Sequence, residues 1–430
     1  MNGLVHSNQF TETIWCINIE CSANPNNLLP YQGHVNSLAS YNTQNIEHLI
    51  IGFMLYEPQI AHDFTEWTKQ TLEYLHETQM FPNLKNVYLL HEYTKVSVSE
   101  LPDHYMVFGH NTRYFLLRSE GTEERSVGLN RLKSWQGNAV DPKALWLIGD
   151  VSNRPHKFPL LYKFADSENL DQVDYSLTSK LNESHQGLDF RKEDPQTYER
   201  VVDIMNEVFN LNLDFDSLTT LYKKFQRTLP GDTFGEMVNN QVHSFDIANY
   251  CFPTEWNDAS LIIMPETWFD NPGGVMRPFW EHNSYPTTEK TWKPIITKKP
   301  FMGMSRFDLQ EKTLEGLGYK TFRKYTSEPN LINGDISISE YISIAHKRIT
   351  SFLDQMEDYQ DGIRQDIEYN YKHHQTVLKE EWDLLYRSCP PLKHVNKHKV
   401  LRLFTPPTHN YIHTFPDEVF NGRIDSENCV

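Results

Sequence analysis

The stretch LIIGFMLYEPQIAHDFTEWTKQTLEYLHETQMFPNLKNVYLL, residues 49–90, contains the alternation of segments that decides the fold class. Its two ends, residues 49–56 and 87–90, are apolar runs of strand length. Residues 61–79 between them have helical spacing, with four large apolar side chains available to one face: Phe64, Trp67, Leu72 and Leu75. A strand, a helix and a second strand form the βαβ unit of a parallel sheet, so the sequence predicts an α/β fold.

The same alternation continues on both sides of this stretch. Residues 14–19 (IWCINI) and 106–108 predict two further strands of a first sheet. A second series follows residue 141, with strands expected at 144–149, 259–264, 301–304 and 319–322, and helices at 159–165, 195–209, 218–228, 288–297 and 307–317. Residues 339–386 predict one long helix or two consecutive ones.

The length of 430 residues favours two domains over a single core. We therefore expect an N-terminal domain over residues 1–140, a second domain over 141–338, and C-terminal helices with a basic tail over 339–430 that pack back on the core.

Composition narrows the class of protein. The 40 Lys and Arg against 57 Asp and Glu give a formal charge of −17. This charge disfavours binding of phosphate backbones over the whole surface, but it is compatible with a local basic site. Five cysteines without a CxxC pair suggest neither a disulfide framework nor a zinc ribbon, and the histidines lack a third ligand at suitable spacing, so no metal is expected. With no secretion signal or membrane span in view, we expect a cytoplasmic protein without membrane partners.

One segment reverses the acidic balance. Residues 287–324 hold nine Lys or Arg against four Asp or Glu, a local charge of +5. Thr288, Glu289 and Lys290 stand at the start of the helix expected there, where free backbone amides favour an anion such as a diphosphate. The alternative is that Thr288 and Glu289 only cap the helix and that the lysines are solvated.

Two segments carry a resemblance to a known family. PTTEKTWKPIITKKPFMGMS, followed by a helix and LGYKTF, together with NRPHKFPLLYKF and the later LDQVDYSL, resembles a group of tailed-phage glycosyltransferases across most of residues 144–325. The resemblance implies a GT-B-like α/β fold: two Rossmann-type domains facing a cleft, with a C-terminal helical extension. It further implies a UDP-sugar donor, UDP-glucose or UDP-arabinose, no required cofactor, and an acceptor domain in the N-terminal half.

Carried over by motif, the resemblance implies the donor contacts. Glu289 and Lys290 would contact ribose and phosphates beside Thr288, Arg154 and Lys157 would approach the diphosphate, and Glu266 with Thr267 would line the sugar pocket. The chain departs from the family at residues 150–153, which are less basic than in relatives, and at 302–305, which are poorer in glycine.

Sugar transfer also needs a general base for the acceptor hydroxyl. Glu20, just past the strand at 14–19, and His110, just past the strand at 106–108, are the candidates, because sheet ligands bind beyond the carboxyl ends of strands. Each has a structural alternative: Glu20 as an exposed acid at a strand end, and His110 as a histidine without a role in the site.

The acceptor expected from the resemblance is hydroxymethylcytosine, or a related hydroxymethylpyrimidine, in phage DNA, whose modification protects it from host nucleases; arabinosyl transfer is one form of this activity. Double-stranded DNA would meet a basic strip that contains no acid: Arg387, Lys393, Lys397, Lys399 and Arg402. A solvated tail is the alternative for the strip. A glycan or protein acceptor, or a non-catalytic protein on the same scaffold, remains the alternative for the function.

Overall fold

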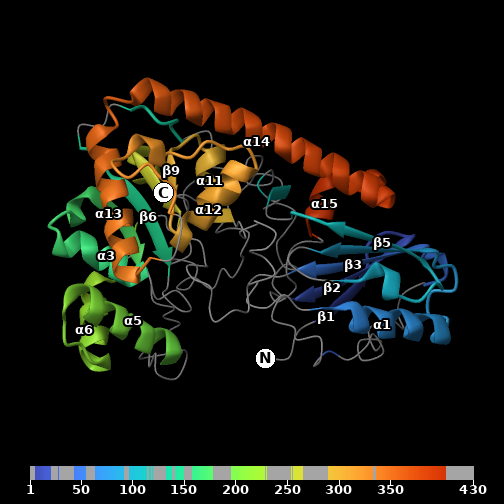
Figure 1. Ribbon diagram of the computed structural model, residues 1–430. Coiled ribbons are helices and arrows are strands. Elements are labelled where there is room, and N and C mark those ends of the chain that lie inside the picture. The colour runs from blue at the N-terminus through green and yellow to red at the C-terminus, as the bar shows by residue number, and fades with distance from the viewer. Residues whose placement is uncertain are drawn as a thin grey trace. The chain divides into compact units, whose positions relative to one another are not determined.

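The computed structural model describes residues 5–20, 28, 43–54, 63–91, 96–113, 116–117, 119, 132–137, 141–149, 157–177, 195–227, 229, 253, 255–264, 289–332 and 336–402. The protein is of the α/β class, with two sheets built mainly from parallel strands (Figure 1). Unit 1 comprises Met1–Gly121, Asn271–Pro286 and Thr376–Thr414, and unit 2 comprises Thr122–Asp270, Thr287–Gln375 and Phe415–Val430. The chain thus passes between the units several times, where the sequence suggested boundaries near residues 140 and 338.

Unit 1 contains the first sheet, with strand order β1-β2-β3-β4-β5. β1 is antiparallel to β2, and the other neighbours are parallel. Its elements are β1 (Val5–Gln9), β2 (Ile14–Glu20), η3 (Thr43–Asn45), β3 (His48–Met54), α1 (Thr65–Thr78), β4 (Asn86–His91), η4 (Val98–Glu100), β5 (Met106–Asn111), the later part of α14 (Gln360–Ser388), η9 (Pro390–His394) and α15 (Lys397–Arg402).

One face of the first sheet forms a core with the segments that connect its strands. Alternate residues of β2, β3 and β4, such as Ile17, Ile51 and Leu89, pack there against α1 and are fully buried. Because β3 and β4 are neighbours and parallel, the right-handed crossover between them places α1 on one side of the sheet. The opposite face therefore needs cover from elsewhere in the chain.

The C-terminal elements of unit 1 supply this cover. The thiols of Cys16 and Cys389 are both buried and close enough to influence each other, and burial raises the pKa of each. Lys399 of α15 places its ammonium 5.0 Å from the ring centre of Phe10, next to β2. Figure 1 shows α1 and α15 on opposite sides of the β1–β5 sheet.

Unit 2 contains the second sheet, with strand order β7-β6-β8-β9 and all neighbours parallel. Its strands read as continuous apolar runs because both faces are buried, as in Leu261–Met264. Its elements are β6 (Ala144–Gly149), α3 (Lys157–Asp166), η6 (Leu170–Gln172), β7 (Val173–Leu177), α5 (Pro195–Phe209), α6 (Phe215–Phe225), α9 (Glu255–Asp258), β8 (Leu261–Met264), α11 (Glu289–Ile296), β9 (Phe301–Gly303), η7 (Arg306–Asp308), α12 (Leu309–Gly316), η8 (Arg323–Tyr325), α13 (Ile338–Gln355) and the earlier part of α14.

The strand expected at residues 319–322 is not formed. The side chain of Asn370 takes the place of a neighbouring strand: its Oδ1 accepts from Lys320 N at 2.7 Å and its Nδ2 donates to Lys320 O at 2.8 Å. The apolar side chains Tyr319 and Phe322 are nevertheless buried. The apolar run therefore marks buried side chains, and the strand predicted there was wrong.

The long C-terminal helical stretch is two helices, α13 and α14. Ser337 caps α13 by accepting from Glu340 N at 3.1 Å. Among the described residues, none of the helices combines the length and apolar character that crossing a bilayer requires.

Candidate functional site

The order of strands in the second sheet marks its ligand-binding edge. From β6 the chain passes to β7 on one side and then to β8 on the other, so the direction of winding reverses between β6 and β8. Parallel sheets bind ligands outside the carboxyl ends of the two strands at such a reversal. The described strands of the first sheet follow one another in chain order and contain no reversal.

Four of the predicted donor residues lie outside the described residues, so their side chains are not placed: Arg154, Glu266, Thr267 and Thr288. Their positions in the chain are still informative. Arg154 follows β6, which ends at Gly149, and Glu266 and Thr267 follow β8, which ends at Met264. These are the two strands that flank the reversal.

The described part of the edge is formed by α11, β9 and α12. Glu289 is the first residue of α11, and Lys290 follows it on the helix. Next, Thr291 accepts a hydrogen bond at its Oγ1 from Gln310 Nε2 at 3.0 Å. The Oε1 of Gln310 is buried and has no partner within the described residues. It lies so close to Gly303, the last residue of β9, that a Cβ there would approach it to 2.7 Å, so a larger residue at this strand end would require the Gln310 side chain to shift.

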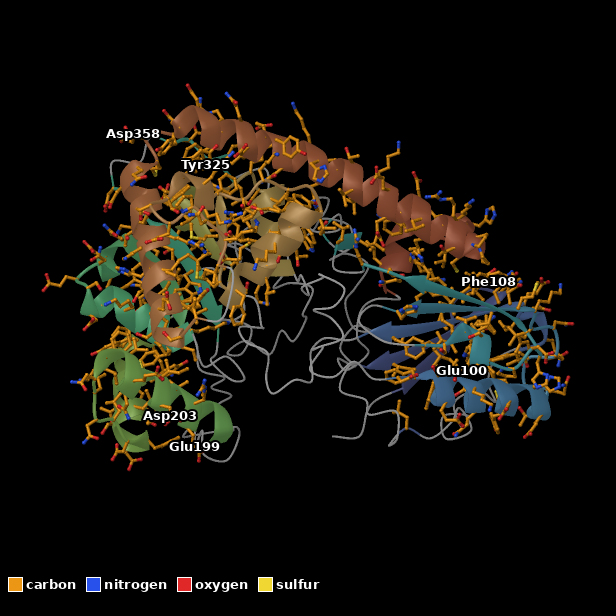
Figure 2. The ribbon with its side chains drawn as sticks, in the orientation of Figure 1. Glu100, Phe108, Glu199, Asp203, Tyr325 and Asp358 are labelled. Atoms are coloured by element: carbon orange, nitrogen blue, oxygen red, sulfur yellow. The ribbon has the colours of Figure 1, made fainter. Side chains whose placement is uncertain are left out.

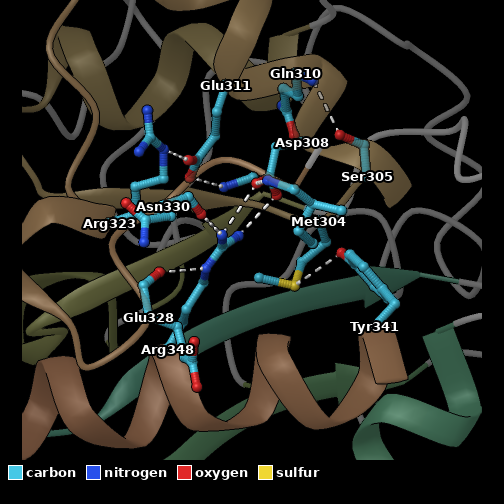
Figure 3. A network of polar contacts seen from close by, with 12 residues as sticks. Met304, Ser305, Asp308, Gln310, Glu311, Arg323, Glu328, Asn330, Tyr341 and Arg348 are labelled. Atoms are coloured by element: carbon cyan, nitrogen blue, oxygen red, sulfur yellow. Dashed lines mark hydrogen bonds and ion pairs between the residues drawn. The ribbon is translucent and has the colours of Figure 1, made fainter. Parts of the chain in front are cut away.

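A buried ion pair supports the turn between β9 and α12 (Figure 3). Phe307 and Asp308 both have left-handed backbone angles, with φ of 62° and 52°. Arg348 of α13 holds Asp308 with two charged hydrogen bonds of 2.7 and 3.0 Å, and both side chains are almost fully buried. The same carboxylate accepts from Ile332 N at 2.7 Å. The turn between β9 and α12 is thus held in place by Arg348 of α13.

Glu311 adds a second acid to this buried network. Burial first, and then the nearby carboxylate of Asp308, raise the pKa of Glu311 to about 7. Its Oε2 lies 3.0 Å from Nε of Arg323, and its Oε1 accepts weakly from Gly303 N at 3.4 Å. The position one residue from Gln310 therefore holds a carboxyl group that takes up a proton near neutral pH.

Lys157 has a structural contact in place of the predicted approach to a diphosphate. It is the first residue of α3, its side chain is 1% exposed, and its Nζ donates to Ile148 O at 2.6 Å. A buried ammonium directed at a strand carbonyl cannot also serve a ligand in solvent without leaving that bond.

The basic segment 287–324 is also largely used within the protein. Lys298 pairs with Glu368 at 3.0 Å, and Lys324 pairs with Asp366. Lys299 donates to Asn257 O at 2.8 Å, and burial lowers its pKa to about 8. These three of the nine basic side chains of the segment therefore have partners within the protein, so the local charge of +5 is not all available to a ligand.

The two candidate bases lie on the first sheet but not beside each other. Glu20 is the last residue of β2, and His110 is the fifth residue of β5. The register aligns His110 of β5 with Leu90 of β4, Gly52 of β3 and Asn18 of β2. β5 therefore lies three strands away from β2. Three strand spacings amount to about 14 Å, so the two candidates occupy well-separated positions on the sheet. His110 is 8% exposed, its Nε2 has no partner within the described residues, and burial lowers its pKa.

The five basic residues predicted to meet DNA lie on α14, η9 and α15. Lys397 places its ammonium over the ring of Trp382 at 4.6 Å, and Lys399 lies over Phe10. Lys393 is exposed, Arg402 ends α15, and Arg387 lies against a pocket of unit 1.

Sequence reasoning missed the buried network around Asp308 and Arg348. One signal was present in the sequence. Arg348 falls in the apolar stripe of α13, between the buried Ala345 and Phe352, where a charge requires a buried partner.

Comparison with protein-family models, curated proteins and solved structures finds no match for the chain. The fold and the site alone define the class: an α/β protein with two sheets built mainly from parallel strands, the second of which has a reversal in strand order.

Proposed function

We propose that this protein is a glycosyltransferase of GT-B type that binds a UDP-sugar at the carboxyl edge of the second sheet. The observation that carries the proposal is the reversal between β6 and β8. The motif residues that resemble a donor site follow these two strands or begin α11: Arg154, Glu266, Thr267, Glu289 and Lys290.

The chemistry of this edge is consistent with a sugar nucleotide. The backbone amides at the start of α11 favour phosphate oxygens, and Gln310 Oε1, which has no partner within the described residues, can accept from a hydroxyl. Because Lys157 is engaged in a buried contact, leaving-group stabilisation is assigned to Lys290 and Arg154.

The proposed acceptor is hydroxymethylcytosine, or a related hydroxymethylpyrimidine, in phage DNA, with glucose or arabinose as the sugar transferred. In the test, the protein is incubated with UDP-glucose or UDP-arabinose and DNA that contains hydroxymethylcytosine. The DNA is then digested to nucleosides, which are weighed by mass spectrometry. We expect one nucleoside to gain the mass of one sugar.

Variants separate this activity from contamination and from misfolding. Glu289→Ala and Lys290→Ala should lower turnover, whereas Lys347→Ala, an exposed residue of α13, should leave it unchanged. An unchanged nucleoside mass together with UDP release on a glycan or protein acceptor would support that alternative acceptor. If neither acceptor yields product and the two α11 variants lose nothing but stability, the protein is not a glycosyltransferase.

A further inference from the structure

A second site with different chemistry lies on unit 1, at the outer edge of the first sheet. A pocket of about 600 Å³ opens there, within the range of sites for small ligands. Its walls come from β4, η4 and β5, and from the junction of α14 and η9. It includes neither Glu20 nor His110, and no residue of unit 2 contributes to it.

An aromatic surface forms one wall. Tyr88 and Phe108 stack with ring centres 5.3 Å apart and planes only 17° apart. Tyr88 is buried, whereas Phe108 keeps 43% of its surface exposed on the edge strand (Figure 2). A large ring left open beside a pocket offers a stacking surface for a planar ligand.

The backbone of β5 supplies polar groups along the same pocket. Met106 N and Thr112 N donate to carbonyls of Lys85 and His91, so alternate residues of β5 bond to β4. By this alternation the N–H and C=O groups of Val107 and Gly109 face the outer edge, and both residues line the pocket. Paired donors and acceptors along a strand edge match the polar edge of a nucleobase.

A positive charge and a histidine complete the pocket. Arg387, near the end of α14, borders it, and its Nε donates to Asp383 O at 3.2 Å. Residues 387–402 contain no acid, so the electrostatic character of this side favours an anion. His91 also lines the pocket, and its Nδ1 is buried without a partner within the described residues.

We propose that this pocket binds a nucleotide, with the base stacked on Phe108, its polar edge on the backbone of β5, and a phosphate at Arg387. The residues of this pocket all belong to unit 1, whereas the proposed donor site belongs to unit 2. A free nucleotide and a nucleotide of a single-stranded nucleic acid present the same chemistry to it.

The test is calorimetric titration of the full chain with dCMP, with a short oligo(dC) and with inorganic phosphate. Phe108→Ala should weaken binding of dCMP or oligo(dC) by about 5- to 150-fold, the range for loss of one stacked base. Arg387→Gln should also weaken it and reduce its dependence on salt. Two matched controls should bind as the unaltered protein does: Met106→Ala, exposed on the same strand outside the pocket, and Lys379→Gln, exposed on α14 outside both the pocket and the basic segment 387–402.

Each outcome decides a point. Binding of dCMP assigns a free nucleotide as ligand, and binding of oligo(dC) alone, with the same loss in the variants, assigns a nucleic acid. Absence of binding by both, equal binding of inorganic phosphate, or binding that Phe108→Ala leaves unchanged would overturn the proposal. Titration of Lys290→Ala with UDP and with dCMP separates the two sites, because this variant should weaken the binding of UDP and leave the binding of dCMP unchanged.

Discussion

Asp308 combines a left-handed backbone conformation with a buried charge, and both are tolerated because Arg348 holds the carboxylate. Replacing Asp308 by Asn keeps the volume and suits the left-handed backbone, but it removes the charge and replaces one acceptor oxygen by an amide group that only donates. Arg348 would then be buried without its counter-ion, which costs about 3–5 kcal/mol. We expect Asp308→Asn to lower the free energy of unfolding by that order, as measured by urea denaturation.

The control for this prediction is an exposed pair in unit 1. Lys85 and Glu47 lie 3.2 Å apart, with 62% and 42% of their side chains exposed, so Glu47→Gln should change stability by less than about 1 kcal/mol. Equal effects from Asp308→Asn and Glu47→Gln would show that the buried network does not stabilise the turn after β9.

Glu311 makes stability depend on pH with a sign opposite to that of an acid in a favourable ion pair. Burial and Asp308 raise its folded pKa to about 7, although the charges of Arg348 and Arg323 oppose them. The unfolded chain releases this proton at the ordinary pKa of 4.5. The stabilising contribution of Glu311 to the free energy of unfolding is therefore complete below pH 4.5. It is lost as the pH rises through about 7.

Glu311→Gln tests this dependence, because glutamine keeps the size of the side chain without titrating. Urea denaturation between pH 5 and pH 8 should show that the unaltered protein loses more stability than the variant as the pH rises. Parallel curves for the two proteins would contradict a raised pKa at Glu311.

At the scale of elements, the sequence predicts what is buried better than what is paired. The runs 14–19, 49–56 and 87–90 identified β2, β3 and β4 because both faces of these strands are covered. β1 (VHSNQ) was missed because an edge strand paired on one side needs no apolar run. Residues 319–322 resembled a buried strand because apolar composition does not reveal that the amide of Asn370 satisfies the backbone.

The two hydrogen bonds between the Asn370 side chain and the backbone of Lys320 lead to a test on α14. Asn370→Ala would leave both Lys320 N and Lys320 O without their partner, a cost of about 1–3 kcal/mol for each group that stays buried. Gln365→Ala is the matched control, since Gln365 is exposed on the same helix. Thermal unfolding should show a lower midpoint for Asn370→Ala alone, and an unchanged midpoint would mean that water replaces the amide.

At the scale of the whole molecule, strand order explains features that local patterns did not show. The reversal in the second sheet appears only when β7 and β8 are placed on either side of β6, and the short run of β7 had not been recognised as a strand. Arg154 and Glu266 were selected by resemblance to a motif, and the topology gives a physical reason for examining the same two segments, which follow β6 and β8. The burial of Lys157 could not be foreseen, because a lysine after a strand has the same sequence pattern whether it binds a ligand or a carbonyl.

The first sheet depends on residues more than 250 positions away, because its crossovers leave one face for the C-terminal elements. Leu385 and Leu384 are neighbours on the later part of α14, but Leu385 is fully buried and Leu384 is 40% exposed. Leu385→Ala should lower the stability of unit 1 by about 2–5 kcal/mol, whereas Leu384→Ala should have little effect.

Hydrogen exchange and thiol labelling locate the effect within the molecule. In Leu385→Ala, amides of β2–β5 should exchange faster and Cys16 should react faster with a thiol reagent, because the face that holds Cys16 opens more often. Amides of β6–β9 should keep their protection, since these strands belong to unit 2. Faster exchange in both sheets would show that the units unfold together, and unchanged exchange in the first sheet would show that α14 does not stabilise it.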